Sequence, residues 1–267
     1  MERDRVLVRF SLESQGDFSL DVHRREIVFN NYFQLHELFS ELSQEDPIRG
    51  QTYSFFPNRY SDWLRRIILK PGQFSQRDLL IELPELILSV GHQLVLSWEE
   101  SKEIAEALLN LNYKIYESQL GMFLPNSKRL VLQEKLSDPN IIFRKLTDGD
   151  EIETWLYLVN DAFGSTDQSE LYRRAFSEEA FLFYAAFCQD EMVATALTFQ
   201  NQESVGLYSV TTSPNYRNRG IASRLVGKII TESESSLPFI LQATKMGKGI
   251  YDKLGFLEIG TFRHWQK

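Results

Sequence analysis

The chain has 267 residues, of which 43% are hydrophobic and 13% aromatic, enough for one large or two ordinary domains with buried cores. A charged fraction of 25% is ordinary for a folded soluble protein and excludes an intrinsically disordered chain. The net charge of −8, with no run rich in Lys or Arg, argues against a nucleic-acid partner.

Compartment can be inferred from cysteine usage and hydropathy. The single cysteine, Cys188, cannot form an internal disulfide, which favours a reducing compartment. The first ten residues, MERDRVLVRF, are charged, so we expect no signal peptide. The longest apolar stretch, residues 79–96, is interrupted by acidic residues, Pro84 and His92 and is unsuited to crossing a bilayer. We therefore expect a cytoplasmic protein without a membrane partner.

The N-terminal half predicts an α/β domain over residues 1–125. In chain order, the patterns predict a strand at 5–12, helices at 25–43 and 58–69, a strand near 92–97, a helix at 101–112 and a strand at 114–124. Residues 126–139 are polar and flanked by prolines, which predicts a linker. Within it, RLVLQEKL (129–136) could equally be a strand or part of a connecting helix.

The C-terminal half, residues 140–267, has a clearer pattern. Ile152, Trp155, Leu156 and Val159 fall at helical spacing after a short apolar strand. The predicted elements are strand 140–146, helix 150–163, strands 180–188, 192–200 and 204–210, helix 221–235, strand 238–243, helix 247–254 and strand 256–265. The residues QDE (189–191) predict a tight turn between the strands 180–188 and 192–200. This order predicts a mixed α/β sheet.

One loop of this half carries a pattern suited to phosphate binding. In NYRNRGIASRL (215–225), Arg217, Gly220 and Ala222 satisfy [Arg/Gln]-x-x-Gly-x-[Gly/Ala] between a strand and a helix. The first turn of a helix has N–H groups without partners and lies at the positive end of the helix dipole. Glycine lets a ligand approach the main chain closely. The alternative is a tight surface turn whose arginines face water.

The order of two segments resembles the GCN5-related N-acetyltransferase (GNAT) superfamily over about residues 140–267. VTTSPNYRNRGIASRLV (210–226) is similar to the acetyl-CoA-binding segment of that family, and LQATKMGKGIYDKLGF (241–256) is similar to the segment that follows it. The resemblance implies a mixed, mostly antiparallel sheet. Its fourth and fifth strands, 207–210 and 239–243, would splay apart, and the pantetheine arm of the cofactor would lie in the gap.

The resemblance also implies the site residues. Tyr251 matches the tyrosine that protonates the departing thiolate; packing as a core aromatic beside Ile250 and Leu254 is the alternative. The implied acetyl-CoA (coenzyme A) site comprises Ser209, Val210, Thr211, Arg217, Asn218, Arg219, Gly220, Ile221, Ala222 and Ser223. The amides of 218–223 would converge on the pyrophosphate. The histidines share no metal-ligand spacing, so we predict no metal site.

The family reaction is direct attack of a neutral amine on the acetyl thioester. The fourth-strand amide of Val210 is the expected donor to the oxyanion. For the proton of the amine, Glu203, Tyr208, Asp161 and a water relay remain alternatives.

The N-terminal half has a partial echo of the same pattern. Residues 91–125 place a strand, a helix and a strand in the order of the closing segment of the C-terminal half, with Tyr113 where Phe256 stands. No phosphate loop precedes them. We therefore predict a degenerate GNAT-like half that walls the acceptor cleft or recognises the acceptor, with an unrelated helical cap as the alternative.

These observations predict an enzyme, an N-acetyltransferase that moves an acetyl group from acetyl-CoA to an amine, a small molecule in preference to a protein. The alternative is a non-catalytic acyl-CoA-sensing or partner-binding module of the same fold. A longer acyl donor also remains open, because the sequence does not give the depth of the thioester pocket.

Overall fold

The computed structural model describes residues 2–72, 74–128 and 140–267, with side chains from residue 20 onward. The strands are β1 Ile48–Arg49, β2 Tyr53–Phe56, β3 Arg66–Leu69, β4 Val95–Trp98, β5 Lys114–Leu124, β6 Ile141–Lys145, β7 Phe181–Cys188, β8 Glu191–Gln200, β9 Val205–Thr212, β10 Phe239–Ala243 and β11 Leu257–Gln266. The helices are α1 Glu2–Leu42, α2 Gln76–Val90, α3 Lys102–Asn110, α4 Glu151–Phe163, α5 Ser169–Phe176, α6 Ile221–Glu232 and α7 Lys248–Lys253, with short 3-10 turns at η1 Asn126–Lys128 and η2 Pro214–Tyr216.

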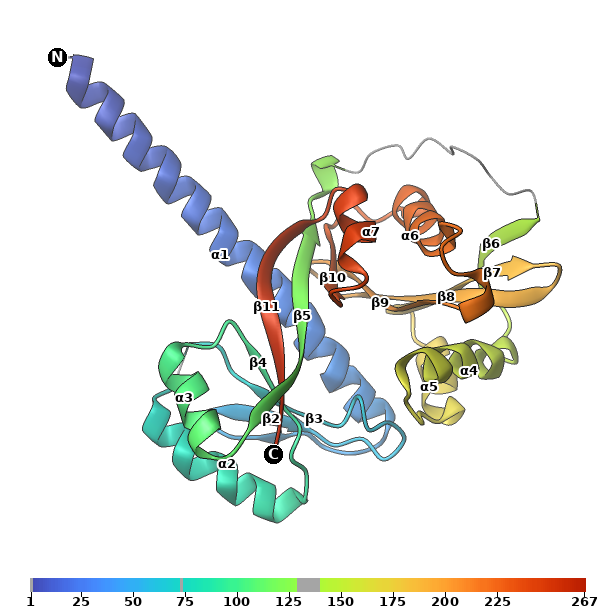
Figure 1. Ribbon diagram of the computed structural model, residues 1–267, viewed down its shortest axis with the longest axis horizontal. Helices are drawn as coiled ribbons and strands as arrows, with labels where there is room; N and C mark the ends of the chain where they lie inside the picture. Colours follow the sequence, from blue (N-terminus) through green and yellow to red (C-terminus); the bar gives the residue numbers. More distant parts are fainter. Residues whose placement is uncertain (1, 73, 129–139) are drawn as a thin grey trace.

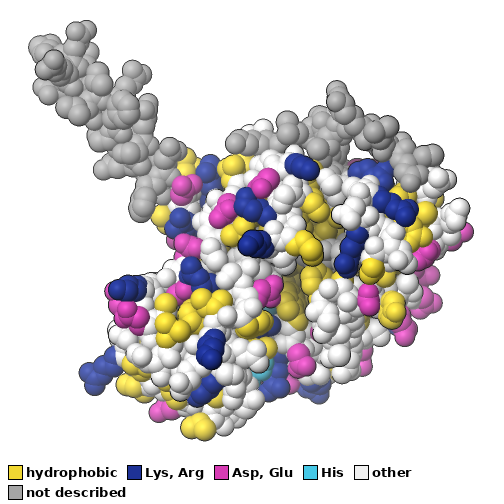
Figure 2. Space-filling view, in the orientation of Figure 1, with side chains coloured by type: hydrophobic (Ala, Val, Ile, Leu, Met, Phe, Trp, Pro, Cys, Tyr) yellow, Lys and Arg dark blue, Asp and Glu magenta, His cyan; other side chains and the backbone are white. Residues whose placement is uncertain are grey.

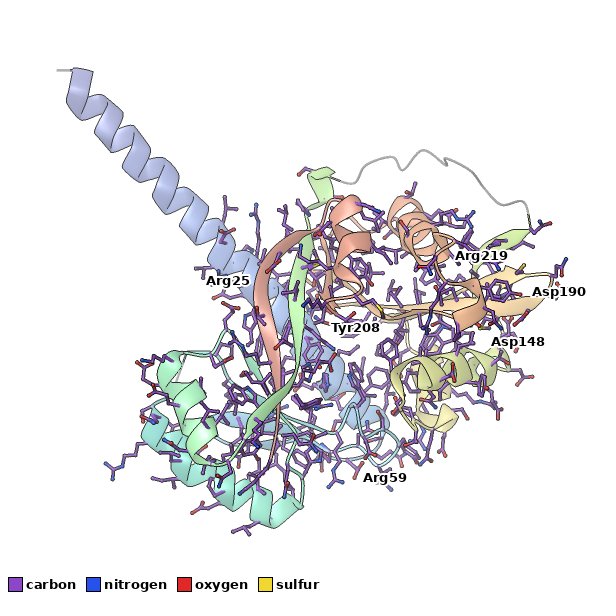
Figure 3. The ribbon with its side chains drawn as sticks, in the orientation of Figure 1. Arg25, Arg59, Asp148, Asp190, Tyr208 and Arg219 are labelled. Carbon is purple, nitrogen blue, oxygen red and sulfur yellow. The ribbon has the colours of Figure 1, made fainter. Side chains whose placement is uncertain are left out.

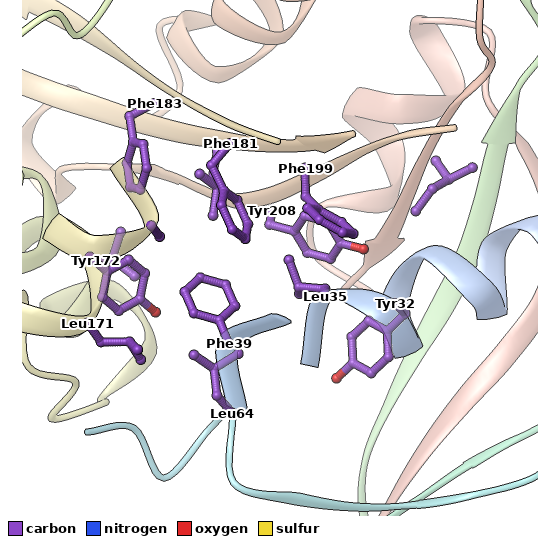
Figure 4. Packing of buried hydrophobic residues seen from close by; sticks show 14 of the residues in the cluster. Tyr32, Leu35, Phe39, Leu64, Leu171, Tyr172, Phe181, Phe183, Phe199 and Tyr208 are labelled. Carbon is purple, nitrogen blue, oxygen red and sulfur yellow. The ribbon is translucent and has the colours of Figure 1, made fainter. Parts of the chain in front are cut away.

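All strands of the described residues form one mixed sheet, in the order β1-β2-β3-β4-β11-β5-β10-β9-β8-β7-β6 (Figure 1). Three apolar clusters cover it. The first joins α1, α4 and α5 to the sheet, the second joins α6 and α7 to its other side, and the third lies between α2, α3 and the strands of the first half. Figure 4 shows the first cluster, in which Phe39 of α1 lies 5.0 Å from Phe181 and 5.6 Å from Tyr172, measured between ring centroids.

In the N-terminal half, the helix expected at 25–43, the helix expected at 101–112 and the strands expected near 92–97 and at 114–124 are confirmed. Two expectations are wrong. Residues 5–12, predicted as a strand, continue α1, because adding residues to a formed helix is favourable once its first turn exists. Residues 58–69, predicted as a helix, end in β3, where Ile67 and Ile68 pair with β2 and β4; β-branched side chains suit a buried strand. Helix α2, which begins at a capping box formed by Ser75 and Asp78, was not predicted.

The C-terminal half has every strand and helix predicted for it, and α5 in addition. The predicted turn at 189–191 is a two-residue reversal in which Gln189 and Asp190 both have positive φ, of 49° and 67°. The expected splay of the fourth and fifth strands is confirmed. Pairing between β9 and β10 ends at Leu207 and Leu241, although both strands continue beyond these residues.

The two halves share the sheet through their closing strands. Strand β5, from the first half, pairs with β10, and β11, from the second half, pairs with both β4 and β5. The division at residues 126–139 stays a prediction, and the strand or helix considered for residues 129–136 lies outside the described residues.

Trp98 packs over the junction between the two halves. Gly121 of β5 and Gly260 of β11 are register partners, and the Trp98 ring covers both. A Cβ added at Gly260 would lie 2.3 Å from the Trp98 ring, and one added at Gly121 would lie 2.6 Å from it. Only residues without a side chain leave room for this ring, so the glycine pair is required by packing.

We expect Gly260→Ala to destabilise the protein by about 1–3 kcal/mol, because the new methyl group must displace a packed indole ring. Urea unfolding followed by fluorescence measures the change. Gly249→Ala is the matched control: its Cβ would meet nothing within 4 Å, and alanine favours the helix α7 in which it lies. Equal midpoints for the two variants would contradict this account of the junction.

Candidate active site

The loop between β9 and α6 has the geometry expected of an anion-binding helix start. Gly220, the N-cap residue of α6, has φ 71°, and no side chain caps the helix. The first bond of the helix runs from the Arg224 amide to the Gly220 carbonyl, at 3.1 Å. By helix geometry the amides of 221–223 have no acceptor within α6, so they are available to a ligand at its N-terminus. A Cβ at Gly220 would meet nothing within 4 Å, so the approach is open.

Two exposed arginines fix the shape of this loop. Arg217 Nε donates to the Thr212 carbonyl at 3.1 Å, and Arg219 Nη2 donates to the Asn215 carbonyl at 3.1 Å. The Arg219 guanidinium lies 5.2 Å from the centroid of the Tyr216 ring. Figure 3 shows Arg219 near the start of α6. Both guanidinium groups therefore add positive charge at the mouth of the helix while they hydrogen bond to the main chain.

The splayed part of β9 contains a bulge. Ser209 has φ 50°, and neither it nor Val210 has a register partner on β8 or β10. The bulge is held by Thr195 of β8, whose hydroxyl donates to the Ser209 carbonyl at 2.8 Å. The Val210 amide thus lies on a stretch of strand that leaves the ladder, where an N–H group can serve a ligand.

Tyr251 of α7 lies in the apolar cluster on the same side of the sheet as α6, and Val210 packs against that cluster. Its ring makes an edge contact with Phe256 at 5.8 Å between centroids. Burial raises the pKa of Tyr251 to about 12, so the hydroxyl stays protonated at neutral pH. The structure therefore combines the packed aromatic with a group able to donate a proton.

The three side chains considered as a proton acceptor do not gather at the bulge. Burial raises the pKa of Tyr208 well above 10, and its hydroxyl donates to Asn31 Oδ1 at 2.7 Å. Glu203 lies before β9 begins at Val205, about 15 Å or more along the strand from Val210 at roughly 3.3 Å per residue. Asp161 is an exposed residue of α4. A water relay is the alternative that these positions favour.

Sequence reasoning missed two residues that shape β9. Thr195 carried no local signal, because its role depends on a strand 14 residues away. Asn31 of α1 donates to Ser204 Oγ at 3.0 Å and accepts the Tyr208 hydroxyl, and it fixes the strand from the other face. Two cavities, of about 50 and 250 Å³, lie against Tyr184 and Phe183, and neither is lined by a predicted site residue.

Comparisons with known proteins agree with this geometry. Residues 148–264 match the family model of the acetyltransferase (GNAT) domain. A GCN5-related N-acetyltransferase from Kribbella flavida has the same fold, with a TM-score of 0.70 at 16% identity over 90% of this chain and 95% of its own. A GCN5-related N-acetyltransferase from Sphaerobacter thermophilus gives 0.55 at 15% identity over 83% and 75%. A functionally unknown conserved protein from Staphylococcus epidermidis gives 0.59 at 13% identity over 82% and 92%. No curated protein matches the chain.

The C-terminal half is therefore a GNAT domain, and the resemblance inferred for it is confirmed. Because the Kribbella flavida structure matches 90% of the chain, the likeness of fold extends into the N-terminal half. The order β4, α3, β5 repeats the order β10, α7, β11. Among the described residues, no helix is long and apolar enough to cross a membrane, and no three His, Cys, Asp or Glu side chains gather to hold a metal.

We expect Thr195→Val to distort the bulge, because the Ser209 carbonyl loses its donor in a nearly isosteric substitution. Loss of a buried hydrogen bond costs about 1–3 kcal/mol in unfolding free energy. Chemical denaturation measures this cost. Thr198→Val is the control. Thr198 lies on the same strand as Thr195, and its hydroxyl makes a longer hydrogen bond, of 3.5 Å, to the Leu182 carbonyl of β7. A Thr195→Val protein as stable as wild type would show that the bulge does not need this bond.

Proposed function

We propose that the chain binds acetyl-CoA at the N-terminus of α6 and transfers its acetyl group to the amine of a small molecule. One observation carries the proposal: an uncapped helix start with an open glycine follows directly from a strand that bulges and leaves its neighbour. The first feature suits a pyrophosphate, and the second opens a gap for the pantetheine arm.

In this proposal each residue of the site has a separate task. Bound acetyl-CoA would supply an acyl group activated as a thioester. The amides of 221–223 bind phosphate oxygens, with Arg217 and Arg219 adding positive charge. The Val210 amide donates to the oxygen that gains charge when the amine attacks. Tyr251 Oη holds its proton at neutral pH because burial raises its pKa to about 12, and it is the group that donates a proton to the departing sulfur.

The remaining predicted cofactor residues line the same path. Ser209 and Thr211 flank Val210 on β9, while Asn218, with φ 62°, sets the turn before Gly220. Small side chains at Ala222 and Ser223 keep the first turn of α6 narrow, and Ile221 is buried beneath it. The non-catalytic acyl-CoA-sensing module stays the second candidate, and retention of a protonated Tyr251 favours the enzyme.

We expect acetyl-CoA to raise the melting temperature of the wild type by several degrees, since a ligand at 100 times its Kd stabilises by about 2.7 kcal/mol. Gly220→Glu should abolish this shift by placing a carboxylate where the phosphates bind. Gly220→Asn is the control for the backbone, because asparagine tolerates positive φ and adds no charge. A well-folded wild type without a shift would refute the cofactor assignment.

We expect Tyr251→Phe to lower kcat by about 10²-fold or more, the size of effect attributed to a positioned proton donor. The acetyl-CoA thermal shift should remain, because the ring stays in the cluster. Thiol release with an amine panel gives kcat, and the shift controls for binding. An unchanged kcat would reduce Tyr251 to a packing residue, and loss of turnover together with the shift would assign it to cofactor binding.

A further inference from the structure

A group of polar side chains is buried on the α1 side of the sheet, where the two halves meet. It comprises Tyr32 and His36 of α1, Arg66 of β3 and His264 of β11, with exposed fractions of 1%, 0%, 2% and 1%. We call these four residues the buried polar cluster. Rings connect it: Tyr32 lies 4.5 Å from His36 and 5.0 Å from Phe262, between centroids.

Every member of the buried polar cluster has a polar atom without a hydrogen-bond partner in the described chain. These atoms are Tyr32 Oη, His36 Nε2, Arg66 Nε and both ring nitrogens of His264. Native proteins pair the great majority of their buried polar groups, and each exception requires an explanation. Four neighbouring exceptions on three elements point to a bound molecule that supplies the partners.

The charge of Arg66 indicates the chemical class of that bound molecule. Arg66 donates from Nη1 to the Tyr116 hydroxyl at 3.0 Å and from Nη2 to the Trp63 carbonyl at 2.9 Å, and both acceptors are uncharged. No carboxylate of the described residues forms an ion pair with it. A buried guanidinium without an ion-pair partner is costly, and its planar donors match the two oxygens of a carboxylate.

Among the described residues no carboxylate forms an ion pair with Arg66, and the Glu117 carboxylate lies near enough to help raise the pKa of Tyr32. Burial lowers the pKa of both His36 and His264 to about 3, so both rings are neutral at pH 7 and each has one N–H donor and one acceptor nitrogen. His36 Nδ1 lies 3.0 Å from the Tyr32 carbonyl and is therefore the donor, which leaves the unpartnered Nε2 as an acceptor. Glu117, the register partner of His264, accepts a hydrogen bond from Gln119 Nε2 at 3.0 Å. Of the atoms without partners, Arg66 Nε, Tyr32 Oη and one ring nitrogen of His264 can therefore donate to an anion.

The buried polar cluster adjoins the proposed active site through Tyr208. Tyr208 directly precedes the bulge residue Ser209, and its hydroxyl reaches Asn31, which neighbours Tyr32 on α1. The contact between α1 and β9 is close: a Cβ at Gly206 would lie 2.3 Å from Asn31 Oδ1. Figure 4 shows Tyr32 and Tyr208 on the two sides of α1's junction with the sheet, and Figure 3 places Tyr208 at the centre of the molecule.

The buried polar cluster comes close to the surface at Tyr116. Tyr116, whose hydroxyl accepts from Arg66, is 47% exposed, so one side chain separates the guanidinium from water. Figure 2 shows a hollow with hydrophobic side chains on the face seen.

We propose that the acceptor of this protein is an amine that also bears a carboxylate, and that Arg66, Tyr32 and His264 bind that carboxylate. The inference rests on the proposed acetyl transfer and adds to it the chemical class of the acceptor. It assigns acceptor recognition to a junction built from both halves.

The test uses matched pairs of amines: each of the common L-amino acids, β-alanine and γ-aminobutyrate, with the corresponding amine that lacks the carboxylate. Each is assayed by thiol release from acetyl-CoA and by thermal shift in the presence of acetyl-CoA. For at least one pair we expect wild type to favour the acid-bearing member by tenfold or more in kcat/KM, and that member to raise the melting temperature.

Arg66→Gln should remove this preference, raising KM for the acid-bearing amine by tenfold or more while the amine without it is unaffected. Tyr32→Phe removes only an unpaired hydroxyl, so a structural role would leave KM unchanged. The proposal instead predicts that Tyr32→Phe raises KM for the acid-bearing amine and leaves the melting temperature without ligand unchanged. Arg65→Gln is the matched control, because the Arg65 guanidinium donates to the Val90 carbonyl outside the buried polar cluster.

The outcomes separate this inference from the proposed function. An acetyl-CoA shift with no pair that favours the acid, by turnover or by thermal shift, overturns the inference and leaves acetyl-CoA binding in place. A preference that survives in Arg66→Gln overturns it as well. Absence of any acetyl-CoA shift in wild type refutes the proposed function, and the inference falls with it.

Discussion

The structure depends on an exchange of strands between its two halves. Each half ends in a strand, helix and strand, and each closing strand pairs with the other half: β5 with β10, and β11 with β4. Since β5 and β11 also pair with one another, neither half completes its sheet alone. The packing of Trp98 over Gly121 and Gly260 joins both halves at the same point. The N-terminal half therefore has a structural task, because its strand β5 extends the sheet of the C-terminal half.

The same exchange of strands offsets the loss of hydrogen bonds where β9 separates from β10. Separating β9 from β10 removes ladder hydrogen bonds from one edge of β10, and unpaired backbone groups are costly when buried. On its other edge β10 pairs with β5 along its whole length, from Phe239 to Ala243. The Ser209 carbonyl, freed by the bulge, accepts from Thr195. The gap between the strands is thus compensated by a strand from the first half and by one side chain of β8.

The sequence was most informative where its signals are local. Helical spacing at Ile152 to Val159, the turn at 189–191 and the glycine at the start of α6 each follow from neighbouring residues, and each is present. The prediction for residues 58–69 was wrong because pairing with distant strands decides their structure. Residues 66–69 form a strand because β2 and β4 flank them, which no local pattern reveals. The partners of Asn31 and Thr195, and the convergence of Arg66 on His264, depend on the order of strands. The splay itself was predicted through family resemblance.

Helix α1 brings these observations together. It packs on β9 through Asn31, on the junction strand β11 through Tyr32, and on β7 through Phe39, so it contacts strands of the second half although it belongs to the first. A helix with so many apolar contacts need not carry buried polar groups for stability, and replacing such groups by apolar ones is often neutral or favourable. Tyr32 and His36 are nevertheless buried with atoms unpaired, beside a guanidinium that forms no ion pair with any described residue. Buried polar groups without hydrogen-bond partners destabilise the fold, and a bound ligand that supplies the partners explains why they are present. We therefore attribute these residues to binding of the acceptor's carboxylate and not to stability of the fold.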